Sequence, residues 1–368
     1  MNILIISFGI KEYDGRLAEL RKVFSKIGEV STISCSYKKN SNKKEKTVYL
    51  NKKKYLSKRN YFKFFISSIL YAFKGNKIDI LVADNMFASI PVLILKKLLK
   101  PKYVIQDIRE LYFYEDINSK VGKLFSKCET RLMKSSDVVL CANKQRAKIM
   151  KEHYDLKLEP LVFENIRFLM GEYDKLELSE KYRDEFEFDL NIISTGGLSL
   201  QRETDKLVES MKNVPENFGL YIVGEGTIND KYVIENIISE NKIKNIRFLN
   251  KVPLPELKYI LSQCDIGIVH YNKLNLNNQY CASGKVYEYL AEGLPIVTTE
   301  NIPLKEFCKE TGVGIADDSF SNGIMHISEN LEDFKKRAKK YISNISVEKY
   351  NEKVAREILQ IIGPEDLS

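Results

Sequence analysis

The sequence contains no run of 18 apolar residues, no Cys-x-x-Cys pair and only three histidines. A membrane-spanning helix needs about 20 apolar residues, so the first absence argues against one. The six cysteines are widely spaced and have no histidine at metal-ligand spacing, which disfavours a zinc site and a disulfide scaffold. The first residues lack the basic region and cleavage site of a signal peptide. We therefore expect a protein of the reducing cytoplasm that holds no metal ion.

Two common nucleotide-binding motifs are also missing. The first predicted strand, over residues 3–7, runs into Phe8, Gly9, Ile10 and Lys11 and not into Gly-x-Gly-x-x-Gly. No Walker A sequence occurs elsewhere in the chain. These absences disfavour a nicotinamide or flavin cofactor, and we expect no cofactor.

The length and composition indicate a folded protein of moderate size. The chain has 368 residues, enough for about two domains at roughly 150 residues each. Hydrophobic residues make up 44% of it and charged residues 29%, which excludes global disorder. No repeat of fixed period is present, so a solenoid is excluded as well.

The excess of basic residues is concentrated in one segment. Residues 38–63 contain eleven lysines and arginines and one acidic residue, Glu45. The segment thus has a net charge of +10, which leaves −2 for the rest of the chain against a total of +8. A nucleic-acid-binding protein carries positive charge over a folded face. Because the charge here belongs to a single segment, we expect no nucleic-acid partner.

Short apolar runs of strand type alternate with longer helical patterns along the whole chain. Their residues are apolar at successive positions, which is typical of strands buried on both faces of a parallel sheet. The predicted strands are residues 3–7, 30–34, 78–83, 103–106 and 137–141 in the first half, and residues 190–194, 219–223, 246–249, 266–269 and 296–298 in the second half.

This alternation predicts an α/β protein with two doubly wound, Rossmann-like parallel-sheet domains. We place the first domain at residues 1–170 and the second at residues 171–346. A charged stretch without clear periodicity, residues 171–188, is the expected linker. Open α/β sheets bind ligands at the carboxyl ends of their strands, so we expect the functional site in a cleft between the domains.

The most informative segment surrounds one short helix of the second half. Ser283 is a suitable N-cap and Gly293 a suitable stop, which predicts a helix over about residues 284–292. Lys285 and Glu288 lie three residues apart and therefore share one face of this helix. Two interpretations are open. In the first, the N-terminus of the helix and Lys285 form a binding site for an anionic group. In the second, the helix is simply capped and carries a surface ion pair.

Four further segments of the second half are weak signals individually but informative as a set. They are residues 192–202, with a Gly-Gly turn before Arg202, residues 220–226, which end in Gly-x-Gly, and residues 245–257 and 264–269. In this order and spacing the set resembles the C-terminal half of retaining, nucleotide-sugar-dependent glycosyltransferases of the GT-B fold, in particular of family 4. The resemblance implies a GT-B fold, a donor bound by the second domain and an acceptor bound by the first. It also implies a final helix, over about residues 347–363, that packs back on the first domain.

The resemblance assigns donor-binding roles in the second domain. Glu288 matches a glutamate that accepts hydrogen bonds from the ribose hydroxyls of the donor, and a carboxylate can accept from two hydroxyls at once. Tyr280 stands where the family has a further glutamate. Gly197 replaces an arginine that binds the diphosphate, and Arg202 stands where a lysine does. Arg202 is then a bidentate phosphate ligand or, alternatively, a solvated residue at a helix start.

The expected donor site draws mainly on turns of the second domain. Its residues are Gly9, Gly197, Arg202, Val252, Tyr280, Cys281, Ala282, Ser283, Lys285 and Glu288, with the backbone N–H groups of residues 281–283 available to the sugar. Arg202 and Lys285 are also expected to be catalytic.

A strand end of the first domain resembles the family's Asp-x-His-Glu segment, with Arg109 in place of the histidine. We expect Arg109 either to be catalytic, by bridging donor phosphate and sugar, or to pair with Glu110 or Asp107 in a structural network. The expected acceptor-binding residues are Asp14, Gly15, Arg16 and Asp107. His270 is the one histidine expected near the cleft, and such a histidine is more often structural.

The resemblance implies a retaining, metal-independent hexosyltransferase in which the acceptor hydroxyl attacks beside the departing diphosphate, with no protein base. Its substrates are a nucleotide sugar and a glycan or lipid-linked acceptor of cell-surface polysaccharide biosynthesis. Two alternatives stay open. One is a degenerate, non-catalytic subunit that binds a sugar nucleotide or a partner, and the other is a GT-B epimerase of a nucleotide sugar.

An aromatic and apolar stretch, residues 61–73, directly follows the basic segment. Cations attract anionic lipid and aromatic side chains suit the headgroup boundary, so the stretch from Lys38 to Phe73 predicts contact with an anionic membrane surface. The alternative is a helix that only covers the first sheet. We expect a cytoplasmic protein that is peripheral at the inner face of the cell membrane.

Overall fold

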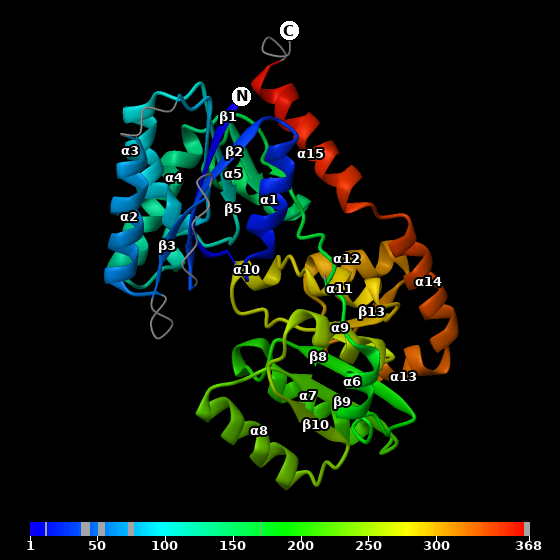
Figure 1. Cartoon of the computed structure of the whole chain (residues 1–368). Coiled ribbons are helices and arrows are strands. Elements are labelled where there is room, and N and C mark those ends of the chain that lie inside the picture. Colours follow the sequence, from blue (N-terminus) through cyan, green and yellow to red (C-terminus); the bar gives the residue numbers. More distant parts are fainter. Residues whose placement is uncertain (12, 38–44, 51–55, 73–76, 170, 364–368) are drawn as a thin grey trace. The chain divides into compact units, whose positions relative to one another are not determined.

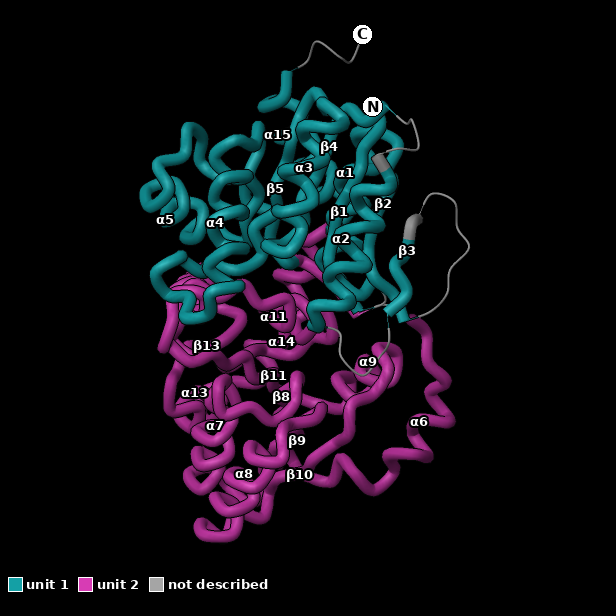
Figure 2. The backbone as a smooth tube through the Cα atoms, turned by 90° about the vertical axis from the view of Figure 1, so that its left-hand side faces the viewer, with its two compact units in different colours: residues 1–165, 347–368 teal, residues 166–346 magenta. Residues whose placement is uncertain are grey.

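The computed structural model describes all residues except 12, 38–44, 51–55, 73–76, 170 and 364–368. The chain forms two compact units, residues 1–165 together with 347–368, and residues 166–346 (Figure 2). We call them unit 1 and unit 2. Much of the basic segment predicted to contact a membrane, namely residues 38–44 and 51–55, lies outside the described residues.

The described part of unit 1 contains a seven-stranded parallel sheet in the order β3-β2-β1-β4-β5-β6-β7 (Figure 1). The central strands consist almost entirely of buried residues, so both faces of the sheet require a helix layer. The strands are β1 (Asn2–Ile10), β2 (Glu29–Ser36), β3 (Glu45–Tyr49), β4 (Ile80–Asp84), β5 (Tyr103–Ile108), β6 (Val138–Cys141) and β7 (Leu161–Val162).

Alternate residues of β1 belong to different hydrophobic cores, as the alternation of side chains along a strand requires. Ile3 and Ile5 pack with α1 and α15 on one face, and Leu4 and Ile6 pack with α2, α3 and α4 on the other. The helices of unit 1 are α1 (Gly15–Ser25), α2 (Lys58–Ala72), α3 (Ser89–Leu99), α4 (Lys120–Lys134), α5 (Lys144–Tyr154) and α15 (Val347–Ile362), with short 3-10 turns η2 (Met86–Ala88) and η3 (Tyr114–Asp116).

The described part of unit 2 contains a six-stranded parallel sheet in the order β10-β9-β8-β11-β12-β13. Its strands are β8 (Leu190–Thr195), β9 (Phe218–Val223), β10 (Ile246–Leu249), β11 (Ile266–Val269), β12 (Ile296–Thr298) and β13 (Gly314–Ala316). The two faces again have separate cores, because Ile193 belongs to one cluster and Ile192 to the other.

Helices cover both faces of this second sheet. α9, α11, α12 and α14 contribute to the core of Ile193, and α7, α8 and α13 contribute to the core of Ile192. The helices of unit 2 are α6 (Lys175–Lys181), α7 (Thr204–Ser210), α8 (Ile228–Glu240), α9 (Leu254–Ser262), α10 (Leu276–Gln279), α11 (Lys285–Ala291), α12 (Ile302–Thr311), α13 (Ser321–Glu329) and α14 (Leu331–Ser343), with 3-10 turns η4 (Leu200–Arg202) and η5 (Met211–Asn213).

Residues 171–188 belong to unit 2, so the prediction that they link the two domains was wrong. They contain α6, and Tyr182, Phe186 and Phe188 pack against the core of unit 2. Aromatic side chains bury a large apolar area, which ties this charged stretch to the unit. The division between the units falls at residues 165 and 166.

The final helix, α15, belongs to unit 1. Its residues Val354, Ala355 and Ile358 are buried in the same core as Leu20 of α1. Tyr350 adds polar contacts, because its hydroxyl accepts a hydrogen bond from Glu164 N at 2.7 Å and donates one to Val162 O at 3.3 Å. In the described part of the chain, no helix is long and apolar enough to cross a membrane.

Candidate functional site

Two glycine-containing turns pack backbone against backbone at the carboxyl ends of β8 and β9. The N–H groups of Gly196 and Gly197 both donate to Val223 O, at 3.0 and 2.9 Å. Gly197 has a φ of +79°, and an added Cβ would lie only 2.0 Å from Glu225 O. Position 197 therefore accepts glycine alone, and no side chain fits where the resemblance implies a diphosphate-binding arginine.

Two cationic side chains converge on the first of these glycines. A hypothetical Cβ on Gly196 would lie 2.7 Å from Lys285 Nζ and 3.1 Å from Arg202 Nη1. Lys285 Nζ donates a hydrogen bond to Thr195 O. Burial, followed by the charge of Arg202, lowers the pKa of Lys285 to about 7. The cationic groups of Lys285 and Arg202, held this close together, can bind an anionic group.

Side chains that follow β11 hold the turn that carries Arg202. His270 Nδ1 hydrogen-bonds with Arg202 O, and Asn272 Nδ2 donates to Gln201 O. Because a carbonyl oxygen only accepts, Nδ1 carries the proton and Nε2 accepts from Ser194 Oγ at 2.9 Å. Burial lowers the pKa of His270 to about 3, so its ring is neutral. These contacts favour a positioning role for His270.

Glu288 is paired with Arg167, a residue that the sequence patterns did not indicate. Arg167 Nε donates to Glu288 Oε1 at 2.6 Å. The side chain of Glu288 is only 10% exposed, and that of Arg167 is 41% exposed. The alternative of a surface ion pair between Lys285 and Glu288 is therefore wrong, because each side chain has a different hydrogen-bond partner.

The start of α11 differs from the sequence prediction. The N-cap is Gly284 and not Ser283, and it makes no side-chain cap. Ser283 is instead buried, and its Oγ has no hydrogen-bond partner among the described residues. The predicted stop at Gly293 is confirmed, since its φ is +80° and its N–H donates to Leu290 O.

The residues before this helix form a short turn. Tyr280 ends α10, and the N–H of Cys281 donates to Asn278 O at 3.1 Å. The expectation that this N–H is available to a sugar is therefore wrong. Ala282 is half-buried beside them. Val252 follows β10 and packs partly buried against the core of unit 2.

A buried tyrosine from α11 holds the end of β8. Tyr289 is fully buried, and its hydroxyl accepts from Thr195 N at 2.9 Å. The same hydroxyl lies 2.9 Å from Thr195 Oγ1. Tyr289 thus fixes the strand residue whose carbonyl oxygen accepts from Lys285. A cavity of about 560 Å³ adjoins these turns, lined by Leu198, Ser199, Gln201, Glu225, Gly226, Thr227 and Asp230.

In unit 1, Arg109 is held by two carboxylates. Its Nε and Nη2 donate to the two oxygens of Asp84, both at 2.6 Å, and its Nη1 donates to Asp14 Oδ2 at 2.8 Å. The suggested partners Glu110 and Asp107 are therefore wrong. Gly9 lies against this network, since an added Cβ would be 2.4 Å from Asp14 Oδ2. The geometry favours the structural interpretation of Arg109.

Arg16 and Asp107 form a second, buried pair in unit 1. Arg16 Nε and Nη2 donate to the carboxylate of Asp107 at 2.7 and 2.5 Å, and Nη1 donates to Phe163 O and Asn165 Oδ1. Asp107 is fully buried. Gly15 begins α1, whose N-cap is Asp14. An acceptor contact by Arg16 or Asp107 requires this buried pair to open.

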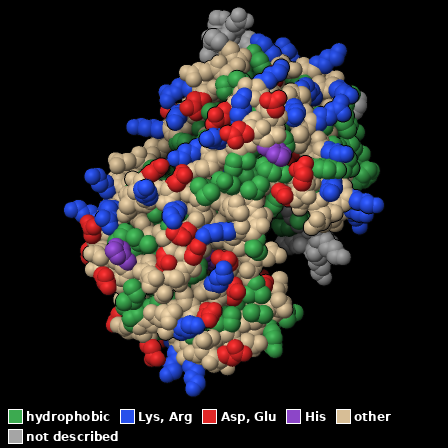
Figure 3. Space-filling view, turned by 180° about the vertical axis from the view of Figure 1, so that it is seen from behind, with side chains coloured by type: hydrophobic (Ala, Val, Ile, Leu, Met, Phe, Trp, Pro, Cys, Tyr) green, Lys and Arg blue, Asp and Glu red, His purple; other side chains and the backbone are tan. Residues whose placement is uncertain are grey.

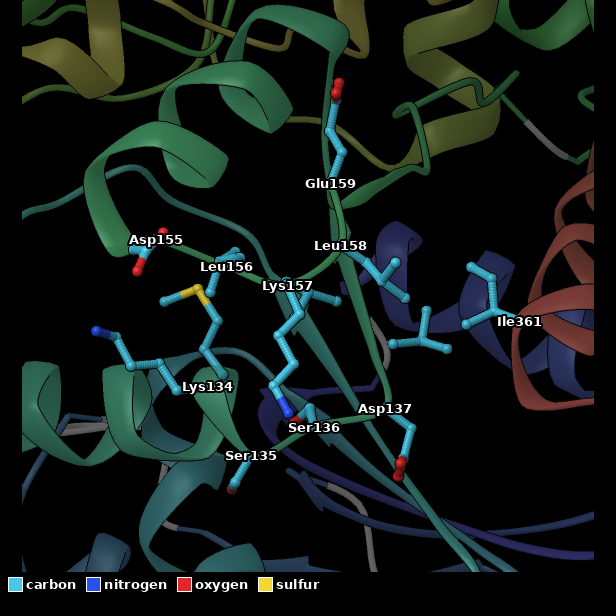
Figure 4. Close-up of a pocket in the computed structure, with 13 residues that line it drawn as sticks. Lys134, Ser135, Ser136, Asp137, Asp155, Leu156, Lys157, Leu158, Glu159 and Ile361 are labelled. Atoms are coloured by element: carbon cyan, nitrogen blue, oxygen red, sulfur yellow. The ribbon is translucent and has the colours of Figure 1, made fainter.

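A separate cavity of about 640 Å³ lies in unit 1 at the amino end of β6 (Figure 4). It contains none of the predicted site residues. It is bounded by the end of α4, the start of β6, the loop of residues 155–159 and Ile361 of α15. Among the residues that the structure describes, no group of three or more His, Cys, Asp or Glu side chains is arranged to hold a metal ion.

Residues 189–344 match the model of the family described as glycosyl transferases group 1. No curated protein matches the chain. Among solved structures, sucrose-phosphate synthase from Thermosynechococcus elongatus is 13% identical with a TM-score of 0.72, covering 98% of each chain. HepE of Anabaena, solved in complex with UDP and glucose, is 13% identical with a TM-score of 0.70, covering 97% of this chain and 99% of that one.

A third similar structure is WaaG, a glycosyltransferase involved in lipopolysaccharide biosynthesis. It is 14% identical with a TM-score of 0.64, covering 97% of this chain and 99% of that one. At these identities the likeness concerns the fold alone. The predicted GT-B fold, with two parallel sheets covered by helices, is confirmed.

Proposed function

We propose that this chain transfers a hexose from a nucleotide-diphosphate sugar to an acceptor. The chain has the GT-B fold of glycosyltransferases, and its residues 189–344 match the group 1 glycosyl transferase model. The reaction proceeds with retention and without a metal ion, and the acceptor is a glycan or lipid-linked sugar of cell-surface polysaccharide biosynthesis. The observation that carries the proposal is the convergence of Lys285 and Arg202 on Gly196 at the carboxyl end of β8.

The donor diphosphate is the anion that suits these two cations. Arg202 can bind phosphate oxygens in a bidentate manner, and Lys285 supplies a point charge beside it. The carboxylate of Glu288 accepts hydrogen bonds from the ribose hydroxyls. The cavity beside the glycine turns has room for part of a nucleotide. Val252, with the turn of residues 280–283, completes the proposed donor site.

In the proposed reaction, the bond between the anomeric carbon and the diphosphate oxygen breaks while a bond to the acceptor oxygen forms on the same face. The acceptor proton passes to the departing diphosphate, so no side chain acts as a base. Negative charge develops on the leaving group, and Lys285 and Arg202 stabilise it in a fixed geometry.

Transfer from a panel of nucleotide sugars to water or to lipid-linked acceptors tests this proposal. We expect Arg202→Ala and Lys285→Ala each to lower turnover at least a hundredfold, by analogy with loss of one charge-stabilising donor. Arg183→Ala, an exposed arginine of unit 2, is the matched control and should retain activity. Near-wild-type turnover in both site variants would contradict the assignment. Donor binding without any turnover would favour a non-catalytic subunit instead.

A layer of three helices supports the further proposal that the protein works at an anionic membrane surface on the cytoplasmic side. α2, α3 and α4 lie side by side over one face of the unit 1 sheet (Figure 2). Glu129 is their only acidic residue, and it is buried. Their basic residues are Lys58, Arg59, Lys63, Lys96, Lys97, Lys120, Lys123, Lys127, Arg131 and Lys134.

Burial, followed by the nearby Glu110, raises the pKa of Glu129 to about 8, so this acid is largely protonated at neutral pH. Another face of the molecule carries lysines and arginines interspersed with acidic side chains (Figure 3). Large apolar side chains are also exposed on the helix layer, between 37% and 64% each: Phe62, Ile66, Leu70, Ile94, Leu98, Val121 and Leu124. Cations with interspersed apolar side chains suit an anionic bilayer.

Co-sedimentation with vesicles of phosphatidylglycerol and phosphatidylcholine tests this surface. We expect binding that weakens as salt is added, because counterions screen the exposed charges. The double variant Phe62→Ser, Leu70→Ser should bind at least fivefold more weakly, because each buried CH₂ contributes about 0.8 kcal/mol. Leu176→Ser, Ile228→Ser, which removes two exposed apolar side chains of unit 2, is the control. Equal binding by both double variants would contradict this surface.

A further inference from the structure

We infer that Arg167 is a third cation of the donor site and binds the diphosphate of the donor directly. The inference rests on the proposed function, because it requires a ligand with a diphosphate. It deepens that function by naming a residue outside the matched domain of residues 189–344. Arg167 would supply the charge that the family carries at the position of Gly197.

Arg167 is held at the site through both its backbone and its side chain. Its neighbours Ile166 and Leu169 are buried, and Leu169 belongs to the core of unit 2. Its Nε donates to Glu288 Oε1 at 2.6 Å. Among the described residues, the two Nη groups of Arg167 have no hydrogen-bond partner. A guanidinium fixed through Nε therefore presents its remaining donors, which have the geometry for bidentate phosphate binding.

The cationic side chains of the site outnumber its carboxylates. Arg202, Arg167 and, when it is protonated, Lys285 supply up to three positive charges beside the single carboxylate of Glu288. Burial is the main cause of the lowered pKa of Lys285, the charge of Arg202 adds to it, Glu288 opposes it, and the charge of Arg167 makes the smallest contribution. A diphosphate placed among the three cations would remove this repulsion. Glu288 meanwhile neutralises and orients Arg167.

A side chain at position 197 cannot take this role. An added Cβ would lie 2.0 Å from Glu225 O and 2.9 Å from the carbonyl carbon of Glu225, both of which are backbone atoms. The close packing of the two turns therefore excludes any cation there. A second phosphate-binding arginine must come from another segment, and Arg167 is placed beside Glu288 to provide it.

Calorimetric titration of UDP, GDP and ADP into the full chain tests the inference. We expect Arg167→Ala to weaken binding of the recognised diphosphate at least tenfold, the effect of about one charge-assisted hydrogen bond, and Arg167→Lys to restore part of the loss. Arg183→Ala is the matched control. Thermal melts within a few degrees of wild type would show that each variant is folded.

A background of Glu288→Gln distinguishes phosphate binding from simple positioning of Glu288. If Arg167 binds phosphate, Arg167→Ala still weakens diphosphate binding several-fold in this background. If Arg167 only orients Glu288, the second substitution has no further effect, and the inference is overturned. A wild-type chain that binds none of the three nucleoside diphosphates would overturn the proposed function and this inference together, whereas tight binding that Arg167→Ala leaves unchanged would overturn the inference alone.

Discussion

Lys285 Nζ donates a hydrogen bond to Thr195 O, and this contact places an ammonium group at the carboxyl end of β8. The lysine comes from α11, and the carbonyl oxygen comes from the strand residue that Tyr289 holds in place. Ninety residues separate the two partners in the sequence. The sheet therefore brings together a cation and a turn that neither segment could position alone.

The lowered pKa of Lys285 predicts a specific pH dependence of donor binding. At pH 8 much of this group is neutral in the free protein, because its pKa is about 7. A bound diphosphate favours the charged form, so binding should take up a proton, with affinity that falls as pH rises from 7 to 9. Calorimetry in two buffers of different ionisation enthalpy measures this uptake. In Lys285→Arg, which stays charged, the uptake should vanish; unchanged uptake there would contradict the assignment to Lys285.

The same shift has a consequence for stability. The unfolded chain binds a proton at Lys285 up to a pKa near 10.5, whereas the folded chain releases it near 7. Stability contributed by this group therefore rises with pH between about 7 and 10.5. Urea denaturation should show that the free energy of unfolding increases less between pH 7 and pH 9 for Lys285→Met than for wild type. An equal increase in both proteins would argue against the lowered pKa of Lys285.

His270 is predicted to position Arg202 without titrating. His270→Ala removes the hydrogen bonds to Arg202 O and Ser194 Oγ and should destabilise the fold by about 1–3 kcal/mol. We expect kcat to fall about tenfold, because the Arg202 turn loses one of its tethers, while the pH profile between 5.5 and 7.5 stays unchanged. His326→Ala is the control. A profile that loses a transition near pH 6.5 would instead indicate a titrating, catalytic histidine.

The sequence predicted the strands well where they are buried and apolar. Residues 246–249, 266–269 and 296–298 match β10, β11 and β12 in full. β3 was missed because it is a short edge strand that carries Glu45 and Lys46, so its sequence lacks a continuous apolar run. Edge strands often carry charge, which hides them from a search for apolar runs.

Local motifs also located part of the candidate site. Arg202 follows a Gly-Gly turn and Lys285 begins a short helix, and both were predicted from these surroundings. Arg167 could not be predicted in the same way. Its partner Glu288 lies 121 residues away, and no turn, cap or periodicity marks the arginine. Long-range charge pairs of this kind depend on how the chain folds back, which local patterns do not encode.

Gly197 is predicted to be irreplaceable for a steric reason. Gly197→Ala must place a Cβ 2.0 Å from Glu225 O at a φ of +79°, so we expect a loss of about 2–4 kcal/mol in the free energy of unfolding. Gly363→Ala is a matched control, because it has a φ of +94° but no atom within 4 Å of the added Cβ. Chemical denaturation measures both. Equal losses would show that backbone conformation, and not the packed turns, sets the requirement.

The pairing of Arg109 with Asp84 predicts that Arg109 matters first for stability. Asp84 is fully buried, and both of its oxygens accept from Arg109 at 2.6 Å. Arg109→Ala would leave this carboxylate without its cation, which typically costs about 3–5 kcal/mol. The double variant Arg109→Met, Asp84→Leu removes both charges and should recover most of that loss. If Arg109→Ala is as stable as wild type but lacks transferase activity, the catalytic role is correct and the structural interpretation fails.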